Sequence, residues 1–499
     1  MVTIGIVFLV LFLGLMTGIG IWGMRKTKTL GDFFLGGRTL GPWISAVAYG
    51  TSYFSAVIFI GFAGTQGWQF GLNSLWIALG NALIGALAAW VVLARRTRRM
   101  TQNLDTMTMP QYLQERYGAR HLKAVAASVI FFFLLPYSAS VFKGLGHLFE
   151  AVFHIPYDVA LLIMIAFTGV YLILGGYFAI ALTDFIQGII MFFGAAAMIL
   201  ILSGQGGGYF EMIKRVSETY LVHVPPAGQP PVLGLNQPSA LTVISLVFMT
   251  SFGTWGLPQM TQKFYAIKNE RVIPKAAIVT TVFALMIGFT AYSTGAFSHV
   301  FFAIDQVPQT GGRVLYDSII PTLLTNQFTG NLQLLLALIL LLVLSASMST
   351  LSSLVLVSSS SVAIDLYPVK ADPATGKDRS VAMMRFLSAI FVIVSYLISR
   401  FQISFIVTLM SLSWGAVSGA FAAPYIYGLY WKRVTKAGAY AGLLSGLGTE
   451  ILLFFVLGAA NSPLAASFAI LVPFAVTPLV SLCTAPPEKA LLDRAFEGV

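Results

Sequence analysis

Hydroxyl side chains gather in the middle of one long apolar segment near residue 350. The residues concerned are Ser345, Ser349, Thr350, Ser352 and Ser353, together with the small residue Ala346. At about 100° per residue along an α-helix, these six residues share an arc roughly 160° wide. Oxygen atoms on such an arc are the ligands that hard cations prefer. Alternatively, the hydroxyls bond back to carbonyls of their own helix and allow another helix to approach closely.

The composition of the chain is that of a membrane protein. Of its 499 residues, 57% are hydrophobic and 9% are charged, whereas a soluble domain carries about 25% charged residues. Apolar segments that can cross a hydrocarbon core of about 30 Å as helices of about 20 residues recur along the chain. We predict an all-α membrane protein with about thirteen transmembrane helices, at 2–24, 42–64, 73–94, 122–150, 157–178, 181–203, 239–260, 274–298, 331–360, 381–399, 403–429, 437–458 and 463–483.

Lysine and arginine residues alternate between the two sides of the predicted membrane. The odd-numbered gaps between spans, and the segment after the last span, hold most of the 29 basic residues, and Lys263 is assigned to one of these gaps. By the positive-inside rule, this bias predicts a plasma-membrane protein whose N-terminus lies outside and whose C-terminus lies in the cytoplasm. The formal net charge of +11 therefore reflects topology, and we predict no nucleic-acid partner.

Two predicted spans carry glycine and hydroxyl residues at mid-membrane, where a lipid-facing helix would carry leucine or valine. The second span reads Gly50-Thr-Ser-Tyr-Phe-Ser55, and the seventh reads Thr250-Ser-Phe-Gly-Thr-Trp-Gly-Leu-Pro258. Pro258 lacks a backbone amide and disfavours helix at the residue before it. Residues 42–203 and 239–429 then form two five-helix units, each led by a broken helix. Because each unit has an odd number of helices, the second unit is inverted in the membrane relative to the first. Paired broken helices indicate a transporter site at the interface between inverted repeats.

The remaining segments complete a single domain over residues 1–499. A peripheral helix, 2–24, precedes the repeats, and two C-terminal helices, 437–483, follow them. In the gap between the repeats, residues 211–224 have the pattern of a short amphipathic surface helix.

Two charged residues stand out within the predicted spans. Asp184 lies near the cytoplasmic start of the sixth span, where a carboxylate is either functional or caps its helix. Lys143 lies towards the outer half of the fourth span, where it could pair with a substrate carboxylate, stand in for a cation or snorkel outward. A proton-coupled transporter would use Asp184 or Lys143 as its titrating group. A membrane enzyme would need a nucleophile with a base, or a metal cluster, and no predicted span contains one.

Several motifs, in their order and spacing, resemble the sodium/solute symporter family over essentially the whole chain. They are Asp32–Pro42, Gly175-Gly176 with Thr183-Asp184, Met348–Ser353 running on to Asp365-Leu-Tyr367, and Ser413-Trp414-Gly415 through Pro424 to Trp431-Lys-Arg433. Bacterial sodium:proline, pantothenate and monocarboxylate symporters are the members that the chain resembles. The resemblance implies a leucine-transporter-type fold, with a 5+5 inverted repeat and peripheral helices.

The resemblance also implies where ions bind. In the family, a shared sodium site joins the first broken helix to the eighth core helix. Carried over by position, its ligands are the backbone carbonyls of Thr51, Phe54 and Ala346 and the hydroxyls of Ser349 and Thr350. Some relatives bind a second sodium ion, and the matching positions here are Asp184, Ser352 and Ser353.

The chain departs from proline-transporting relatives at three positions. Those relatives carry an acid where Tyr53 stands, and Trp and Tyr where Thr250 and Thr254 align. The stretch Gly253–Pro258 is more similar to the pantothenate and monocarboxylate branches. The candidates for the substrate pocket are Ser52, Ser55, Tyr137, Lys143, Thr250, Thr254, Trp255, Ser413 and Trp414.

We therefore expect a sodium-coupled secondary symporter that imports a small organic solute, carboxylate or amino-acid-like, by alternating access. Its partners would be Na+, the solute and the lipid bilayer, with no obligate protein partner, and it would not be an enzyme. A proton-coupled transporter of the same fold is the alternative.

Overall fold

The computed structural model describes residues 2–26, 34–174, 177–225, 235, 239–367 and 380–499. Almost all of these residues are helical, as predicted, and the one sheet named among them is a two-stranded antiparallel hairpin of β1, Gln309–Thr310, and β2, Arg313–Val314. Asp32, Phe33, Gly175 and Gly176, which contribute to the family resemblance, lie outside the described residues.

The first half of the chain begins with α1 and contains the first broken helix, which is made of α3 and the helical segment η2. Its elements are α1 Val2–Lys26, η1 Gly36–Arg38, α3 Pro42–Tyr53, η2 Val57–Gly67, α4 Trp68–Phe70, η3 Gly71–Ser74, α5 Leu75–Gly80, η4 Asn81–Ala88, α6 Ala89–Asn103, α7 Met109–Tyr117, α8 Arg120–Phe153, α9 Tyr157–Leu174, α10 Tyr177–Gln205 and α11 Tyr209–His223.

The second half contains the other broken helix, made of α12, η5 and α13. Its elements are α12 Ala240–Phe252, η5 Gly253–Gly256, α13 Pro258–Tyr265, η6 Glu270–Val272, α14 Ile273–Phe301, η7 Ile304–Gln306, α15 Tyr316–Gln327, η8 Gly330–Leu332, α16 Gln333–Ser360, η9 Ser361–Leu366, α17 Ser380–Arg400, α18 Ile406–Tyr430, α19 Lys436–Leu457, η10 Ala459–Asn461, α20 Ser462–Leu482 and α21 Lys489–Ala495.

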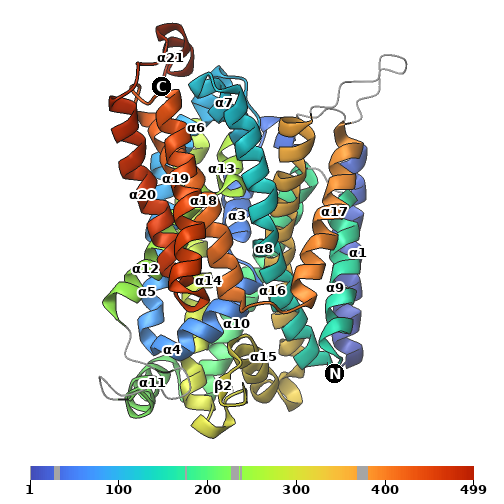
Figure 1. Cartoon of the computed structure of the whole chain (residues 1–499). Coiled ribbons are helices and arrows are strands. Elements are labelled where there is room, and N and C mark those ends of the chain that lie inside the picture. Colours follow the sequence, from blue (N-terminus) through green and yellow to red (C-terminus); the bar gives the residue numbers. More distant parts are fainter. Residues whose placement is uncertain (1, 27–33, 175–176, 226–234, 236–238, 368–379) are drawn as a thin grey trace.

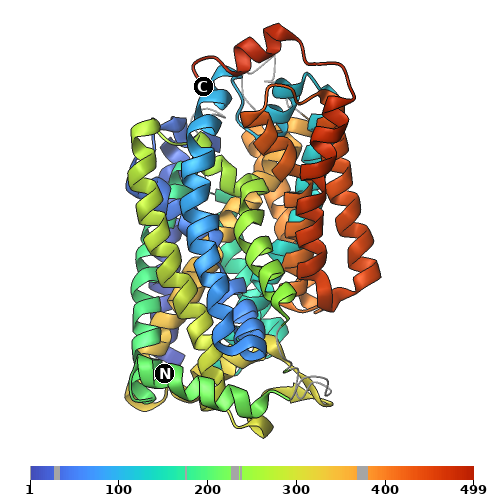
Figure 2. The ribbon, with the colours of Figure 1, turned by 90° about the vertical axis from the view of Figure 1, so that its left-hand side faces the viewer.

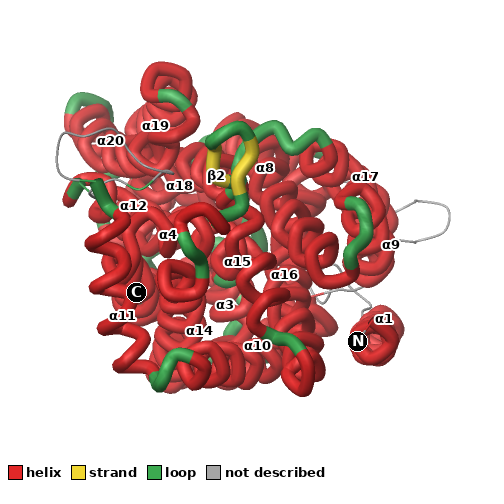
Figure 3. The backbone as a smooth tube through the Cα atoms, turned by 90° about the horizontal axis from the view of Figure 1, so that it is seen from below, coloured by secondary structure: helices red, strands yellow, loops and turns green. Residues whose placement is uncertain are grey.

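The helices form one bundle, and its N- and C-termini lie at opposite ends (Figure 1). Seen along the bundle, α3 lies among α10, α14 and α16, while α1 and the pair α19 and α20 lie at the rim (Figure 3). Helix α11 lies across the end of the bundle that carries the N-terminus (Figure 2). It confirms the predicted surface helix at 211–224, and its buried residues Met212, Val216 and Tyr220 follow one another at one-turn spacing.

The predicted number of thirteen spans is not confirmed. Within the described residues, ten helices are long and apolar enough to cross a membrane, and the bent pair Ala240–Gly256 and Pro258–Tyr265 gives up to eleven. One reason is that Val57–Asn103 forms a single series of helical turns, which reverses direction between α4 and α5 (Figure 1). At Gly71 φ is 53°, in the left-handed region that favours glycine. Another reason is that α3 is only 12 residues long.

Both predicted helix breaks are present. The first helix stops where Phe54 adopts extended dihedral angles, φ −111° and ψ 130°. The second stops at Leu257, with φ −80° and ψ 122°, and Pro258 begins the next helix as its first residue. The two halves of this second broken helix make an angle of 47°. Its second half continues to Tyr265, so the assignment of Lys263 to a loop is wrong, and this side chain is buried inside the bundle.

Backbone hydrogen bonds tie the entrance of the first broken helix to the exit of the second. The Lys268 amide donates to the Leu40 carbonyl at 3.0 Å, and the Leu40 amide donates to the Ala266 carbonyl at 3.4 Å. The side-chain amide of Gln262 also donates to the Phe34 carbonyl at 2.9 Å. The two broken helices are therefore fastened to each other at the end of the bundle that carries the C-terminus.

Candidate functional site

The hydroxyls of α16 meet the carbonyls of the first helix break. Ser349 Oγ lies 2.9 Å from the Thr51 carbonyl oxygen, and Thr350 Oγ1 lies 3.3 Å from the carbonyl oxygens of both Thr51 and Phe54. The Ala346 carbonyl lies 3.0 Å from Ser349 Oγ. The structure thus brings together all five residues that the resemblance assigns to the shared sodium site, and each is fully or almost fully buried.

The break explains why these carbonyls are accessible to side chains. A helix leaves its last four carbonyls without partners in the helix, and α3 ends in the middle of the bundle rather than at its surface. Partnerless carbonyls buried there are costly unless another group binds them. Hydroxyls of α16 now serve that purpose by donating to them. When these hydroxyls turn their protons away, the same oxygens form a cage of carbonyls and hydroxyls that suits an alkali cation.

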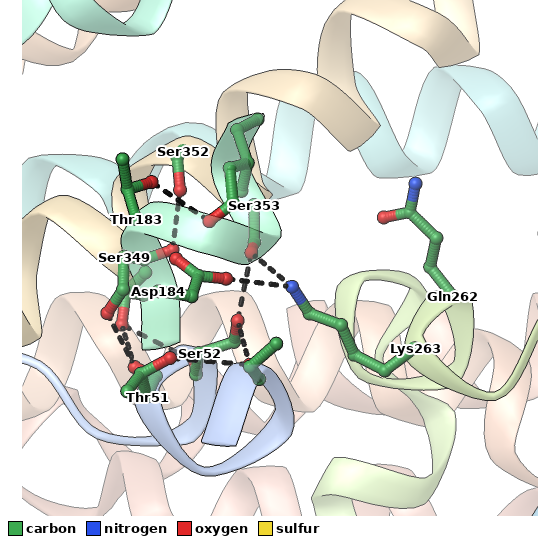
Figure 4. Close-up of polar contacts among 12 residues, drawn as sticks. Thr51, Ser52, Thr183, Asp184, Gln262, Lys263, Ser349, Ser352 and Ser353 are labelled. Atoms are coloured by element: carbon green, nitrogen blue, oxygen red, sulfur yellow. Dashed lines mark hydrogen bonds and ion pairs between the residues drawn. The ribbon is translucent and has the colours of Figure 1, made fainter. Parts of the chain in front are cut away.

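A second polar cluster lies next to this cage and contains a lysine (Figure 4). Lys263 Nζ lies 3.4 Å from Asp184 Oδ2 and 3.1 Å from Ser353 Oγ. Ser353 Oγ is in turn 2.9 Å from Ser52 Oγ, and Ser52 follows Thr51, whose carbonyl accepts from Ser349, in the chain. Lys263 and Asp184 are at most 1% exposed. The cluster joins α13, α10, α16 and α3.

The residues predicted for a second sodium ion are only partly brought together. Asp184 and Ser353 share the ammonium group of Lys263, whereas Ser352 Oγ donates to the Ser349 carbonyl of its own helix at 2.8 Å. The sequence reasoning missed Lys263 because it ended the seventh span at residue 260. A usable signal was present: a helix that restarts at Pro258 must run for more than one turn before it leaves the membrane.

A small cavity lies beside the first break, and we call it the central cavity. Its volume is about 20 Å³, which is room for little more than one water molecule. In this conformation the surrounding side chains therefore pack against one another and leave almost no free volume. The lining residues are Tyr53, Phe54, Ser55, Val57, Ile58, Phe62, Asn81, Tyr137, Thr250, Tyr292, Met410 and Trp414.

The polar groups of the central cavity connect the two broken helices. The Tyr53 hydroxyl donates to the Thr250 carbonyl at 2.6 Å, and Thr250 Oγ1 donates to Asn81 Oδ1 at 2.8 Å. The Trp414 ring stacks on Tyr53 with centroids 6.3 Å apart and meets Tyr137 edge-on at 5.7 Å. A solute in this cavity would therefore touch both breaks and would lie against aromatic faces.

Only part of the predicted substrate pocket lines this cavity, namely Ser55, Tyr137, Thr250 and Trp414. Ser52 belongs to the lysine cluster instead. The hydroxyl of Thr254 donates to the Ser251 carbonyl at 2.8 Å, and the Trp255 indole donates to the Ile84 carbonyl at 3.1 Å. Ser413 is fully buried, but it is not among the residues that line the cavity.

Lys143 also lies away from the central cavity. Its ammonium group lies 2.7 Å from Asp317 Oδ2 and 2.9 Å from the Ser404 carbonyl oxygen. It lines a larger cavity of about 830 Å³, the outer cavity, together with residues of α8, α15 and the start of α18. Because its charge is buried and paired, Lys143 does not snorkel.

Sequence reasoning missed several further residues. Asn81, Tyr292 and Met410 line the central cavity but lie on spans that show no break in the sequence. Glu450 was also overlooked, although an acid inside the apolar stretch 437–458 was a visible signal. It is fully buried on α19, and neither of its carboxylate oxygens has a hydrogen-bond partner among the described residues.

Known sequences match this chain over most of its length. The family model described as the Sodium:solute symporter family matches residues 33–446. The osmoregulated proline transporter OpuE of Bacillus subtilis (strain 168) is 29% identical over 473 residues, which cover 92% of this chain and 89% of that relative. The high-affinity proline transporter PutP of the same organism is 28% identical over 492 residues, which cover 95% and 97%.

Solved structures share the fold. A Na+-coupled sialic acid symporter in a substrate-bound, outward-open state matches with a TM-score of 0.77 at 16% identity, over 97% of this chain and 99% of that chain. MhsT in complex with L-phenylalanine matches with a TM-score of 0.52 at 12% identity, over 87% and 98%. Identities this low support a common fold and carry no information about substrates.

Proposed function

The chain belongs to the sodium:solute symporter family, and on that premise we propose that it imports a small organic carboxylate together with Na+ by alternating access. Its relatives are transporters, which confirms the prediction that it is not an enzyme. Membership of the family also makes Na+ its coupling ion and the lipid bilayer its environment. The solute, the ion ligands and the orientation in the plasma membrane are parts of the proposal.

The observation that carries the proposal is the meeting of Ser349 and Thr350 with the carbonyls of Thr51 and Phe54. A sodium ion among these oxygens, with the Ala346 carbonyl, would replace hydroxyl–carbonyl hydrogen bonds by ion contacts. It would hold the first broken helix against α16. Rocking of the bundle that separates α3 from α16 would then dismantle the ion site. Sodium therefore binds one state better than the other, which is the requirement for coupling.

The proposed architecture has thirteen spans, with residues 42–203 and 239–429 as inverted repeats within one domain, 1–499. An odd number of crossings is supported by the termini, which lie at opposite ends of the bundle (Figure 1). With the N-terminus outside, α11, α15 and the outer cavity face the exterior. The outer cavity would then be the entrance for the solute. The hydrogen bonds between the start of the first broken helix and the end of the second would close the cytoplasmic side.

The central cavity supports a carboxylate with an apolar body as the solute. Its lining, as far as the structure describes it, includes six aromatic rings and no charged side chain. A carboxylate could bind at the start of η2, because helix N-termini at broken helices favour anions, and the nearby sodium ion would add positive charge. An ammonium group would find no carboxylate among these lining residues. An amino-acid-like solute, which the names of the proline-transporting relatives suggest, is therefore the second candidate.

Proton coupling through Asp184 or Lys143 is less well supported. Each of these residues already forms a buried ion pair, Asp184 with Lys263 and Lys143 with Asp317. Neither residue lies at the central cavity. Uptake that persists without sodium and follows a proton gradient would favour the proton-coupled alternative.

Reconstituted protein can test the proposed function directly. Proteoliposomes would be given an inward sodium gradient and a panel of radiolabelled solutes, with acetate, pyruvate, lactate, pantothenate and proline among them. We expect uptake of a monocarboxylate that stops when choline replaces external sodium. Uptake that is equal in sodium and in choline would contradict sodium coupling, and uptake of proline alone would contradict the carboxylate assignment.

A further inference from the structure

We propose that the ammonium group of Lys263 is a tethered cation that takes the place of a second sodium ion, so that the transporter binds one Na+ per cycle. This inference rests on the proposed sodium site at Thr51 and Ser349. It concerns a neighbouring cluster, however, and the two can fail separately.

The position of the ammonium group is the first argument. Lys263 Nζ lies within hydrogen-bond distance of Asp184 Oδ2 and Ser353 Oγ, at 3.4 and 3.1 Å. These two residues are the ones that the family resemblance assigns to a second ion. Figure 4 shows the lysine side chain directed into their midst from α13, while the neighbouring Gln262 points away. The ammonium group therefore occupies the space between two residues that the resemblance assigns to an ion.

The local charge balance is the second argument. The cluster holds one carboxylate, Asp184, and one ammonium group, Lys263, and both are buried. The Tyr177 ring adds a face whose centroid is 5.2 Å from the Lys263 nitrogen. A sodium ion added here would place two positive charges beside a single carboxylate in a medium of low polarity, where like charges repel strongly. Sodium would therefore bind only if the lysine were absent.

The hydrogen-bond pattern is the third argument. An ammonium group donates three hydrogen bonds and accepts none, whereas a bound sodium ion needs oxygens that turn lone pairs toward it. Ser353 Oγ accepts a hydrogen bond from the Lys263 ammonium group and is also 2.9 Å from Ser52 Oγ. Ser352, the third ligand that a second ion would use, is bonded within its own helix. The oxygens of Asp184 and Ser353 thus accept from the lysine, and the Ser352 hydroxyl is directed to a carbonyl of its own helix.

The tether has a consequence for transport. Lys263 is part of α13, the second half of the broken helix whose first half carries Thr250 at the central cavity. The occupancy of this place by a free ion would depend on the external concentration of sodium. A lysine is always present, so it links α13 to α10 and α16 at every sodium concentration. The transporter would gain this link without spending a second ion from the gradient.

Equilibrium binding of radioactive sodium to the purified full chain in detergent, with no solute present, tests the inference. We expect about one sodium ion per chain for the unaltered protein and about two for Lys263→Gln, because the released Asp184 carboxylate becomes a ligand. Lys263→Arg keeps the positive charge and should bind about one. The double variant Lys263→Gln/Asp184→Asn lacks both charges and should also return to about one. Lys143→Met removes a buried lysine elsewhere and should leave the number at one.

The outcomes separate this inference from the proposed function. Two sodium ions in the unaltered protein would overturn the tethered cation and leave the sodium symporter intact. No bound sodium in the unaltered protein would instead contradict the first ion site. If Lys263→Gln keeps a cooperative thermal transition but still binds one ion, the tethered cation is overturned. If Lys263→Gln does not fold, the unaltered protein and Lys263→Arg still decide, because two ions in either would refute the inference.

Discussion

Lys143 Nζ and Asp317 Oδ2 lie 2.7 Å apart at the wall of the outer cavity, and both side chains are about 5% exposed. The same carboxylate oxygen accepts from the Ile406 amide at 3.3 Å, and the same ammonium donates to the Ser404 carbonyl at 2.9 Å. The pair therefore fastens α8 to α15 and to the start of α18. In the proposed orientation, this ion pair holds these segments together on the outer side of the central cavity, and we call it the latch.

Breaking this latch should destabilise the protein. Lys143→Met leaves Asp317 buried without its partner, which costs about 3–5 kcal/mol when a buried pair loses one member. We expect a lower midpoint of thermal unfolding in detergent. The double variant Lys143→Met/Asp317→Leu, which removes both charges, should recover most of the loss. A double variant as unstable as the single one would show that packing, rather than charge pairing, is responsible.

The hydroxyls of the proposed sodium site should set the affinity for sodium. Ser349→Ala or Thr350→Ala removes an oxygen ligand, and a bond to a charged group is worth about 1.5–3 kcal/mol. The sodium concentration for half-maximal uptake should rise roughly tenfold or more. Ser345→Ala is the matched control, because its hydroxyl lies on the same helix and has no hydrogen-bond partner among the described residues. Equal sodium dependence in all three variants would contradict the site.

Asp184 and Glu450, two of the buried acids of the bundle, should respond differently to neutral replacements of the same shape. Asp184→Asn leaves the Lys263 ammonium buried without a counter-charge, so we expect a loss of about 3–5 kcal/mol. Glu450→Gln removes a carboxylate with no partner among the described residues, so its thermal midpoint should not fall. Equal losses in the two variants would mean that the contact between Asp184 and Lys263 does not stabilise the fold.

The helix breaks and the hydroxyl-rich face of α16 could be predicted because each depends on local residue types. Pro258 lacks a backbone amide and disfavours helix at the residue before it, and hydroxyls spaced by three or four residues share a helix face. The sequence therefore indicated both that α16 carries an oxygen-rich face and that the second span is broken near Thr51.

The ion pairs could not be predicted, because they depend on where helices end and how they pack. The position of Lys263 depended on the length of the helix after Pro258, and a difference of five residues moved it from a loop into the bundle. Asp317 lay in a predicted loop, so nothing in the sequence paired it with Lys143 across 174 positions. The number of spans is not confirmed for a related reason, since broken helices are shorter than the membrane is thick.

The hydrogen bond between the two broken helices should matter for the solute more than for sodium. The Tyr53 hydroxyl donates to the Thr250 carbonyl at 2.6 Å and lies at the central cavity. Tyr53→Phe keeps the ring that stacks on Trp414 but removes this bond, which is worth about 1 kcal/mol. For the solute that the uptake screen identifies, we expect KM to rise or the maximal rate to fall about fivefold, while sodium affinity is retained. Thr250→Val keeps the carbonyl that accepts this bond and removes the hydroxyl, whose partners are Asn81 Oδ1 and the Leu246 carbonyl, so it reports on the solute pocket. A change of sodium affinity in Tyr53→Phe as large as that in Thr350→Ala would mean that the tyrosine positions the Thr51 and Phe54 carbonyls instead.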